Sequence, residues 1–126
     1  YDATIFTHGT TVAQALEAAE TLGALGHSIR VIDMFTLKPI DADLIERCAK
    51  ETGGRFVVLE DHLAYGGLAS RVADVLADRN IHLTAFERLG IPQVYAGFGG
   101  DEELRDKYGY GLTSTISAVM RALAAK

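Results

Sequence analysis

Four consecutive apolar residues, Phe56-Val57-Val58-Leu59, place the strongest constraint on how this chain folds. A strand with one solvated face alternates apolar and polar residues, whereas an uninterrupted apolar strand is covered on both faces. Such strands are typical of parallel sheets that lie between two layers of helices. We therefore expect a strand over 55–60 inside a sheet of this kind.

Strand-like and helix-like segments alternate along the rest of the chain. Segments 3–8, 28–34 and 81–89 are rich in β-branched and apolar residues, which predicts strands. Between them, apolar residues recur three or four positions apart, which is the spacing of one helix face. This alternation predicts an α/β fold, a three-layer α/β/α sandwich around a mostly parallel sheet. The predicted inward-facing helical residues are Val12, Ala15, Leu16, Ala19 and Leu22, then Leu44, Ile45 and Cys48, then Leu68, Val72, Val75 and Leu76, and finally Ile116, Val119, Met120 and Leu123.

Local signals indicate where these helices begin and end. Ser, Thr and Asp accept hydrogen bonds from the first free amides of a helix, and glycine suits the residue after its last turn. A loop over 61–67 is expected before the third helix, and a long irregular stretch with a short helix over 101–107 is expected after Gly90. The expected N-caps are Thr10 or Thr11, Asp41, and Thr113 or Ser114, and the expected stops are Gly26 and Gly53-Gly54.

Length and composition fit one globular domain over residues 1–126. The chain is 48% hydrophobic and 23% charged, close to the average of globular proteins. Its net charge of -5 and its scattered basic residues argue against nucleic acid as a partner. The longest apolar runs are far shorter than the roughly 20 residues of a membrane span, so we expect no membrane association. The single cysteine excludes an internal disulfide and favours a cytoplasmic protein.

The most informative polar segment is 58–67, where the third strand ends and the third helix begins. Glu60, Asp61 and His62 together could transfer protons, and Gly66-Gly67 at a helix start could let a phosphate or a carboxylate approach. In the structural interpretation, the two acids instead accept hydrogen bonds from loop amides. His62 is then a surface residue, and the glycines allow close packing.

Two further candidates are weaker. The turn His8-Gly9-Thr10 could present backbone amides to an anion, or it could be an ordinary tight turn with a helix cap. Cys48 has the phase of an inward helical residue, so a buried thiol is expected, and His27 and His82 are isolated in the sequence. The chain has no Walker loop and no recognisable Ser, Lys or Cys nucleophile motif.

Four segments in order resemble the C-terminal domain of transketolases. They are His8-Gly9 with the following helix, Arg30 to Asp41, Val58 to His62 followed by Gly66-Gly67-Leu68, and Leu104 to Leu112 with Lys107-Tyr108-Gly109. In the family the last segment usually continues directly to Leu, whereas Tyr110-Gly111 intervene here. The chain lacks the family's Gly-Asp-Gly signature for thiamine diphosphate. It begins at Tyr1 without Met, so we expect an excised domain or a fragment of a larger enzyme.

The resemblance implies a sheet with strands in the order second, first, third, fourth. An additional antiparallel strand would precede Tyr1. This order brings His8, Gly9 and Thr10 beside the Glu60 to Gly67 loop in a switch-point crevice, where open α/β sheets bind ligands. An anion or partner contact is therefore expected from two sequence-distant groups. The predicted contact residues are His8, Gly9, Thr10, Glu60, Asp61, His62, Gly66, Gly67 and Arg71.

By the same resemblance, the parent enzyme transfers two-carbon ketol units between sugar phosphates. Thiamine diphosphate and magnesium would lie in upstream domains or in a separate subunit, and this domain would bind neither cofactor and carry no catalytic residue. It would support packing in a homodimeric enzyme of the pentose phosphate pathway. The alternatives are the same domain of a 2-oxo acid dehydrogenase β-subunit or of deoxyxylulose-phosphate synthase, and a stand-alone anion- or partner-binding module.

Overall fold

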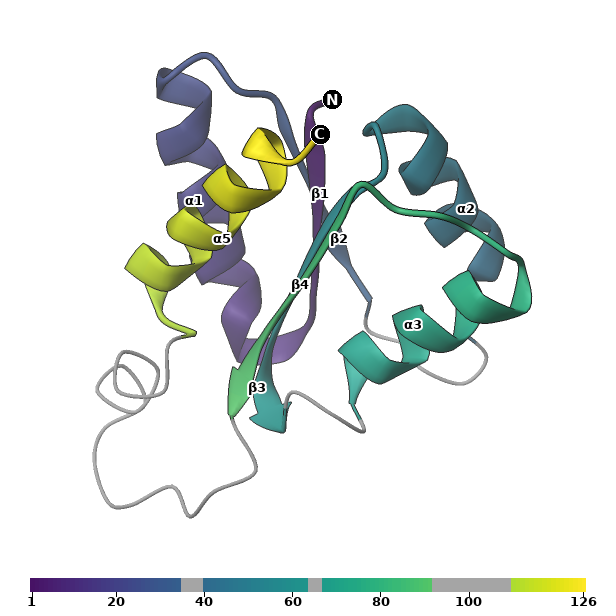
Figure 1. Cartoon of the computed structure of the whole chain (residues 1–126). Helices are drawn as coiled ribbons and strands as arrows, with labels where there is room; N and C mark the ends of the chain where they lie inside the picture. Colours follow the sequence, from purple (N-terminus) through teal and green to yellow (C-terminus); the bar gives the residue numbers. More distant parts are fainter. Residues whose placement is uncertain (35–39, 64–66, 92–109) are drawn as a thin grey trace.

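In the described part of the chain, a parallel β-sheet lies between two pairs of helices (Figure 1). The computed structural model describes residues 1–34, 40–63, 67–91 and 110–126. Within these residues α1 and α5 cover one face of the sheet, and α2 and α3 cover the other (Figure 1). The elements are β1 (Ala3–Thr7), the short 3-10 helix η1 (Gly9–Thr11), α1 (Val12–Ala24), β2 (Ile29–Asp33), α2 (Ala42–Glu51), β3 (Arg55–Leu63), α3 (Leu68–Asp78), β4 (Ala85–Ile91) and α5 (Leu112–Ala124).

The four described strands are all parallel and follow the order β2-β1-β3-β4. This confirms both the predicted sandwich and the predicted strand order. β1 lies between β2 and β3, and all five of its residues are buried. Parallel neighbours need crossover connections, and here the helices supply them.

Two apolar cores lie on opposite faces of the sheet, and β3 contributes to both. Val57 and Leu59 pack with α1 and α5, while Phe56 and Val58 pack with α2 and α3. Successive side chains of a strand point to opposite faces. The unbroken apolar run therefore reflects what was predicted, because helices cover both faces of this strand.

Several predicted boundaries were wrong by a few residues. β3 extends to Leu63, so Asp61 and His62 belong to the strand and not to the predicted loop. β4 begins at Ala85 rather than at residue 81, and it ends at Ile91. Strand pairing sets these ends: the ladder between β3 and β4 starts at Arg55–Ala85, and after an irregularity it resumes at Leu63–Ile91. The predicted short helix over 101–107 lies outside the described residues.

Two helices face the core through smaller residues than predicted. Ala15, Ala18 and Leu22 are the buried residues of α1, whereas Leu16 is 54% exposed. In α5 the buried residues include Ala118, Val119 and Ala122, and Met120 is 43% exposed. Alanine and threonine let these two helices approach the sheet and each other closely, which turns the neighbouring Leu16 and Met120 outward.

The predicted N-cap positions are right at two helices and wrong at the third. The Asp41 side chain accepts a hydrogen bond from the Leu44 amide at 3.0 Å, as expected for the N-cap of α2. Thr11 is the N-cap of α1, one of the two expected residues, although its side chain makes no cap hydrogen bond there. Gly111, not Thr113 or Ser114, is the N-cap of α5, since the helix begins one residue later at Leu112.

Candidate functional site

The candidate site lies at the edge of the sheet where the strands reach their carboxyl ends. Thr7, the last residue of β1, pairs with Leu59 of β3. His8 and Glu60 follow these two residues directly, so the parallel register brings them side by side. Gly9 then turns the chain into η1 with φ +64, a conformation that residues other than glycine rarely adopt.

Glu60 is the buried acid of this edge. Its side chain is 1% exposed, and its Oε2 lies 3.2 Å from Nε2 of His8, whose side chain is 32% exposed. The amide of Leu68 donates to the same Oε2 at 2.9 Å, and the amide of Ala69 donates to Oε1 at 3.5 Å. The carboxylate thus occupies the first amides of α3, where the helix dipole favours negative charge. These bonds match the structural interpretation of Glu60.

Gly67 makes room for this carboxylate. A Cβ atom at Gly67 would lie 2.6 Å from Oε1 and 2.8 Å from Oε2 of Glu60. Its φ is -105°, so close approach and not a left-handed backbone is the reason for glycine here. The glycine next to a helix start therefore admits a carboxylate that belongs to the same chain.

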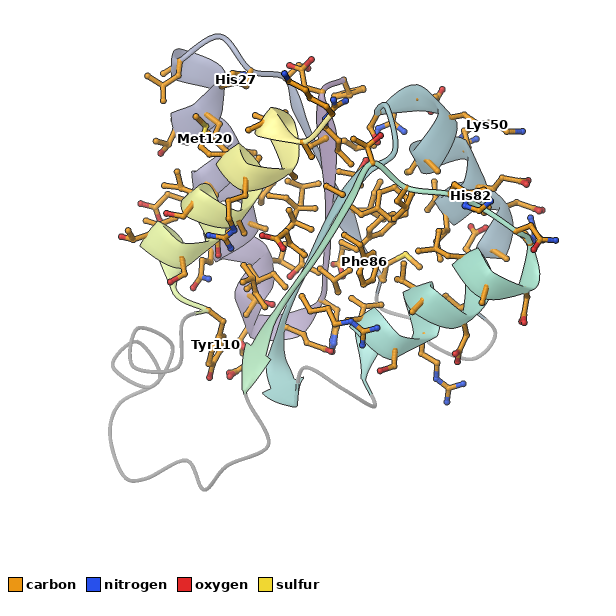
Figure 2. All side chains as sticks on the ribbon, viewed as in Figure 1. His27, Lys50, His82, Phe86, Tyr110 and Met120 are labelled. Atoms are coloured by element: carbon orange, nitrogen blue, oxygen red, sulfur yellow. The ribbon has the colours of Figure 1, made fainter. Side chains whose placement is uncertain are left out.

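Asp61 faces the other helical layer. Thr10 donates from Oγ1 to its Oδ2 at 3.2 Å, and the buried Tyr110 donates from its hydroxyl to its Oδ1 at 3.0 Å. Figure 2 shows Tyr110 at this end of the molecule, at the start of α5. Consecutive strand residues point to opposite faces, so two adjacent acids reach two different helical layers.

Hydroxyl and amide groups brace the surrounding turn. Thr7 and Thr11 share a hydrogen bond of 2.7 Å between their Oγ1 atoms, and Thr11 also donates to the carbonyl of His8 at 3.0 Å. Gln14 of α1 donates from Nε2 to the carbonyl of Tyr110 at 2.7 Å and to Oγ1 of Thr115 at 3.1 Å. The turn after β1 is therefore fixed to the start of α5.

The structure brings together most of the predicted contact residues. His8, Gly9 and Thr10 lie beside Glu60 and Asp61, and Gly67 touches Glu60. Arg71 is half-buried in the first turn of α3, and its guanidinium makes no hydrogen bond or ion pair with the part of the chain that the structure describes. His62 lies in β3, and Gly66 lies outside the described residues.

Sequence reasoning missed Tyr110 and the amides of Leu68 and Ala69. Tyr110 is 49 residues from Asp61, and no local pattern links a tyrosine before a helix to an acid in a strand. The amides carry no side-chain signal at all. Only the parallel strand register and the position of α5 bring these groups to Glu60 and Asp61.

The remaining candidates lie away from this edge. Cys48 is a free, buried thiol, as predicted, and Nη1 of Arg30 lies 3.4 Å from its sulfur. His27 lies at the opposite end of the molecule from Tyr110, and His82 lies beside α2 (Figure 2). Among the described residues, no group of three His, Cys, Asp or Glu side chains could hold a metal ion. No helix in this part of the chain is long and apolar enough to cross a membrane.

The arrangement is better suited to holding elements together than to proton transfer. Glu60 and His8 have the contact that an acid–base pair needs. The Glu60 carboxylate, however, is buried and already accepts hydrogen bonds from two helix amides. Asp61 is likewise engaged by two hydroxyl groups.

Comparison with known proteins finds one family across nearly the whole chain. A family model described as transketolase, C-terminal domain, matches residues 1–114. Transketolase-like protein 2 of Homo sapiens is 40% identical over 121 residues, which are 95% of this chain and 19% of that protein. The 1-deoxy-D-xylulose-5-phosphate synthase 1 of Geobacter metallireducens is 35% identical over 95% of this chain and 20% of that protein.

Solved structures agree with these sequence relatives. A structure described as a split gene transketolase, inactive beta4 tetramer, has a TM-score of 0.89 and 39% identity, and it covers 99% of this chain and 40% of its own. A transketolase from Campylobacter jejuni has a TM-score of 0.65 at 20% identity, a likeness that shows the fold alone. The chain spans about a fifth of the length of the curated relatives it matches.

Proposed function

The chain belongs to the transketolase C-terminal domain family, and we propose that it is the non-catalytic assembly domain of a thiamine-diphosphate-dependent transketolase. The parent enzyme would transfer two-carbon ketol units between sugar phosphates in the pentose phosphate pathway. The observation that carries this proposal is the state of the two acids at the carboxyl edge. Glu60 and Asp61 both accept hydrogen bonds from this chain's own groups, so they serve its architecture.

Thiamine diphosphate and magnesium belong, in this proposal, to other parts of the parent enzyme. The chemistry of two-carbon transfer would be supplied by that cofactor and not by side chains of this domain. The described edge does not fit a diphosphate. Its two adjacent carboxylates repel phosphate, and the Glu60 carboxylate already occupies the first amides of α3.

The partner is then the chain or subunit that carries the cofactor domains, in an assembly that we expect to be homodimeric. Residues 1–126 form one domain of that parent. The relative described as a split gene transketolase supports a partner on a separate chain. The buried thiol of Cys48, which forms no disulfide, favours a cytoplasmic setting. The net charge of -5 argues against a nucleic-acid partner.

We assign the partner contact to the accessible part of the carboxyl edge. His8, Gly9, Thr10 and Arg71 are all partly or fully exposed there, whereas Glu60 and Gly67 are buried behind them. His62 and Gly66, next to this surface in sequence, complete the predicted contact. Arg71 is its cation, because its guanidinium has no acid partner within the described residues.

A second candidate activity has a specific observation in its favour. Two curated 1-deoxy-D-xylulose-5-phosphate synthases match 123 residues of this chain at 35% and 38% identity, close to the 40% of the transketolase-like protein. The domain could therefore serve a synthase.

Reconstitution tests the proposal. The chain is assayed with thiamine diphosphate, magnesium, and a ketose and an aldose phosphate, first alone and then with a polypeptide that carries the thiamine-diphosphate-binding domains. We expect turnover only in the reconstituted sample. Turnover by the chain alone would refute a non-catalytic domain. Formation of 1-deoxy-D-xylulose 5-phosphate would select the synthase.

A charge reversal tests the contact surface. Arg71→Glu is expected to weaken association with the partner at least tenfold, and Lys50→Glu provides the matched control. Lys50 is exposed on α2, far from Tyr110 in Figure 2. Equal affinities for the two variants would remove Arg71 from the contact.

A further inference from the structure

We propose that Glu60 and Asp61 form a two-sided clasp that makes the carboxyl edge of the sheet open and close as one unit. Each acid ties the end of β3 to a different helical layer, and both acids reach the same turn after β1. This inference is independent of the parent enzyme's reaction. It concerns how this domain holds both of its helical layers against the end of the sheet.

The Glu60 side of the clasp fastens α3. Its carboxylate accepts hydrogen bonds from the Leu68 and Ala69 amides at 2.9 and 3.5 Å, and it lies 3.2 Å from Nε2 of His8. An ionised carboxylate that is 1% exposed is costly unless such partners compensate it. The same carboxylate therefore requires both α3 and His8 to be in place.

The Asp61 side fastens α5. Its two carboxylate oxygens accept from Thr10 at 3.2 Å and from the Tyr110 hydroxyl at 3.0 Å. Tyr110 is 1% exposed, and its carbonyl accepts from Gln14 of α1 at 2.7 Å. The start of α5 is thus held to the end of β3 and to the first turn of α1.

The two sides meet in the turn around Gly9. His8 contacts Glu60 and Thr10 contacts Asp61, and the two residues flank a glycine whose φ of +64 fixes the turn. Hydrogen bonds run from the first amides of α3 through Glu60 to His8, and from Thr10 through Asp61 to Tyr110, and the backbone of Gly9 joins these two halves. A disturbance at one end changes the turn on which the other end depends.

Amide hydrogen exchange of the 126-residue chain tests the clasp. Tyr110→Phe removes one hydroxyl on the α5 side and preserves the ring that fills the core. We expect the amide of Leu68, on the opposite face of the sheet, to exchange about fivefold faster, as for the loss of one ordinary hydrogen bond. Thr10→Val removes the other donor to Asp61 and is expected to act in the same direction.

The reciprocal variant is Glu60→Gln, whose amide group cannot accept from two helix amides and His8 at once. The clasp predicts faster exchange at Thr115, whose amide donates to the carbonyl of Gly111 in the first turn of α5. If Glu60→Gln does not fold, the Tyr110→Phe and Thr10→Val arms decide alone. Thr84→Val, which removes an exposed hydroxyl bound to the Gly53 carbonyl, is the control and should change neither amide.

These exchange rates distinguish a clasp, in which Glu60 and Asp61 act together, from two contacts that act independently. Faster exchange at Leu68 in Tyr110→Phe and Thr10→Val, with no change in Thr84→Val, supports the clasp. Exchange that changes only around α5 in these variants would overturn it, because Asp61 and Glu60 would then act separately. Equal changes in the Thr84→Val control would also overturn it, since they would reflect a general loss of stability.

Discussion

Gly67 shows how one missing side chain can decide the position of a charge. The Cβ atom that alanine would add lies within 3 Å of the carboxylate of Glu60, which is buried and would have to leave the amides of Leu68 and Ala69 to make room. Overpacking of this kind costs about 1–3 kcal/mol. We expect Gly67→Ala to lower the free energy of unfolding by about 2 kcal/mol, within the usual range for a strained buried contact, as measured by urea denaturation.

Gly23→Ala is the matched control for this substitution. Gly23 lies inside α1 at a position where an added Cβ meets nothing within 4 Å. Alanine there is expected to stabilise the chain by up to about 1 kcal/mol, because glycine is a poor helix former. Equal effects of the two variants would contradict the close approach of Glu60 to Gly67.

A different pair, Arg30 and Glu51, makes stability depend on pH. Arg30 donates from Nη1 to Oε1 of Glu51 at 2.8 Å, and this hydrogen bond lowers the pKa of Glu51 below its ordinary value of 4.5. A carboxyl group with a lowered pKa in the folded state stabilises it above the unfolded pKa. This contribution is lost as the pH falls through the folded pKa.

Glu51→Gln is therefore expected to lower Tm at about pH 7 and to match the parent chain at about pH 2, where both side chains are neutral. Thermal unfolding followed by circular dichroism across this range measures the difference. Glu17→Gln removes the same charge from the exposed face of α1 and controls for net charge. A Tm difference for Glu51→Gln that persists unchanged at low pH would argue against the Arg30 contact.

At the scale of elements, α1 illustrates the choice between neighbouring helical stripes. Leu16 belongs to the more apolar stripe, yet it is exposed, while Ala18 is fully buried against the sheet. Leu16→Gln is expected to change the free energy of unfolding by less than about 0.5 kcal/mol, as for other exposed positions. Ala18→Leu should destabilise by about 1–3 kcal/mol through overpacking. Chemical denaturation of both variants measures these changes. A larger loss for Leu16→Gln than for Ala18→Leu would instead support the inward-facing residues inferred from the sequence.

The order of elements was predictable because each one has a strong local pattern. The apolar run from Phe56 to Leu59 and the Asp41 cap both depend on residues close together in the chain. The orientation of Leu16 and Met120 was not predictable, since hydrophobicity does not show how closely two helices pack. Gly111 was missed as the cap of α5 because Thr113 and Ser114, two residue types that favour the N-cap, lie only two and three positions after it.

The candidate site was predictable only in part, for a related reason. Parallel strand order places the turn at Gly9 beside Glu60, and this order came from a family resemblance. The role of Glu60 depends on backbone amides and that of Asp61 on Tyr110, and neither kind of partner has a sequence motif. The sequence alone therefore left proton transfer, anion binding and structural hydrogen bonding as open alternatives.

At the scale of the whole molecule, different groups hold the helices at the two ends of the strands. At the edge opposite Glu60, Arg55 donates from Nε to the carbonyl of Ala122 and from Nη2 to the carbonyl of Ala125, both at 3.0 Å. The helix dipole also favours a cation such as Arg55 at the C-terminus of α5. Both ends of α5 are therefore fastened to β3 and its neighbours.

Lysine in place of Arg55 keeps the charge but cannot reach two carbonyls with a planar group. We expect Arg55→Lys to cost about 1 kcal/mol, the usual contribution of a hydrogen bond, and to speed amide exchange in the last turn of α5. Arg121→Lys, which alters an exposed pair with Glu87, serves as the control. An unchanged last turn in Arg55→Lys would show that the Ala125 contact contributes nothing.

The central position of β1 has a consequence for synthesis. This strand is the first element of the chain described here to leave the ribosome, and its neighbour β3 follows about fifty residues later. α5, which covers one of its faces, emerges after all the other described helices. A nascent chain therefore carries a fully buried strand without one of its helical covers until α5 has emerged, so this face of the sheet is expected to close late in folding.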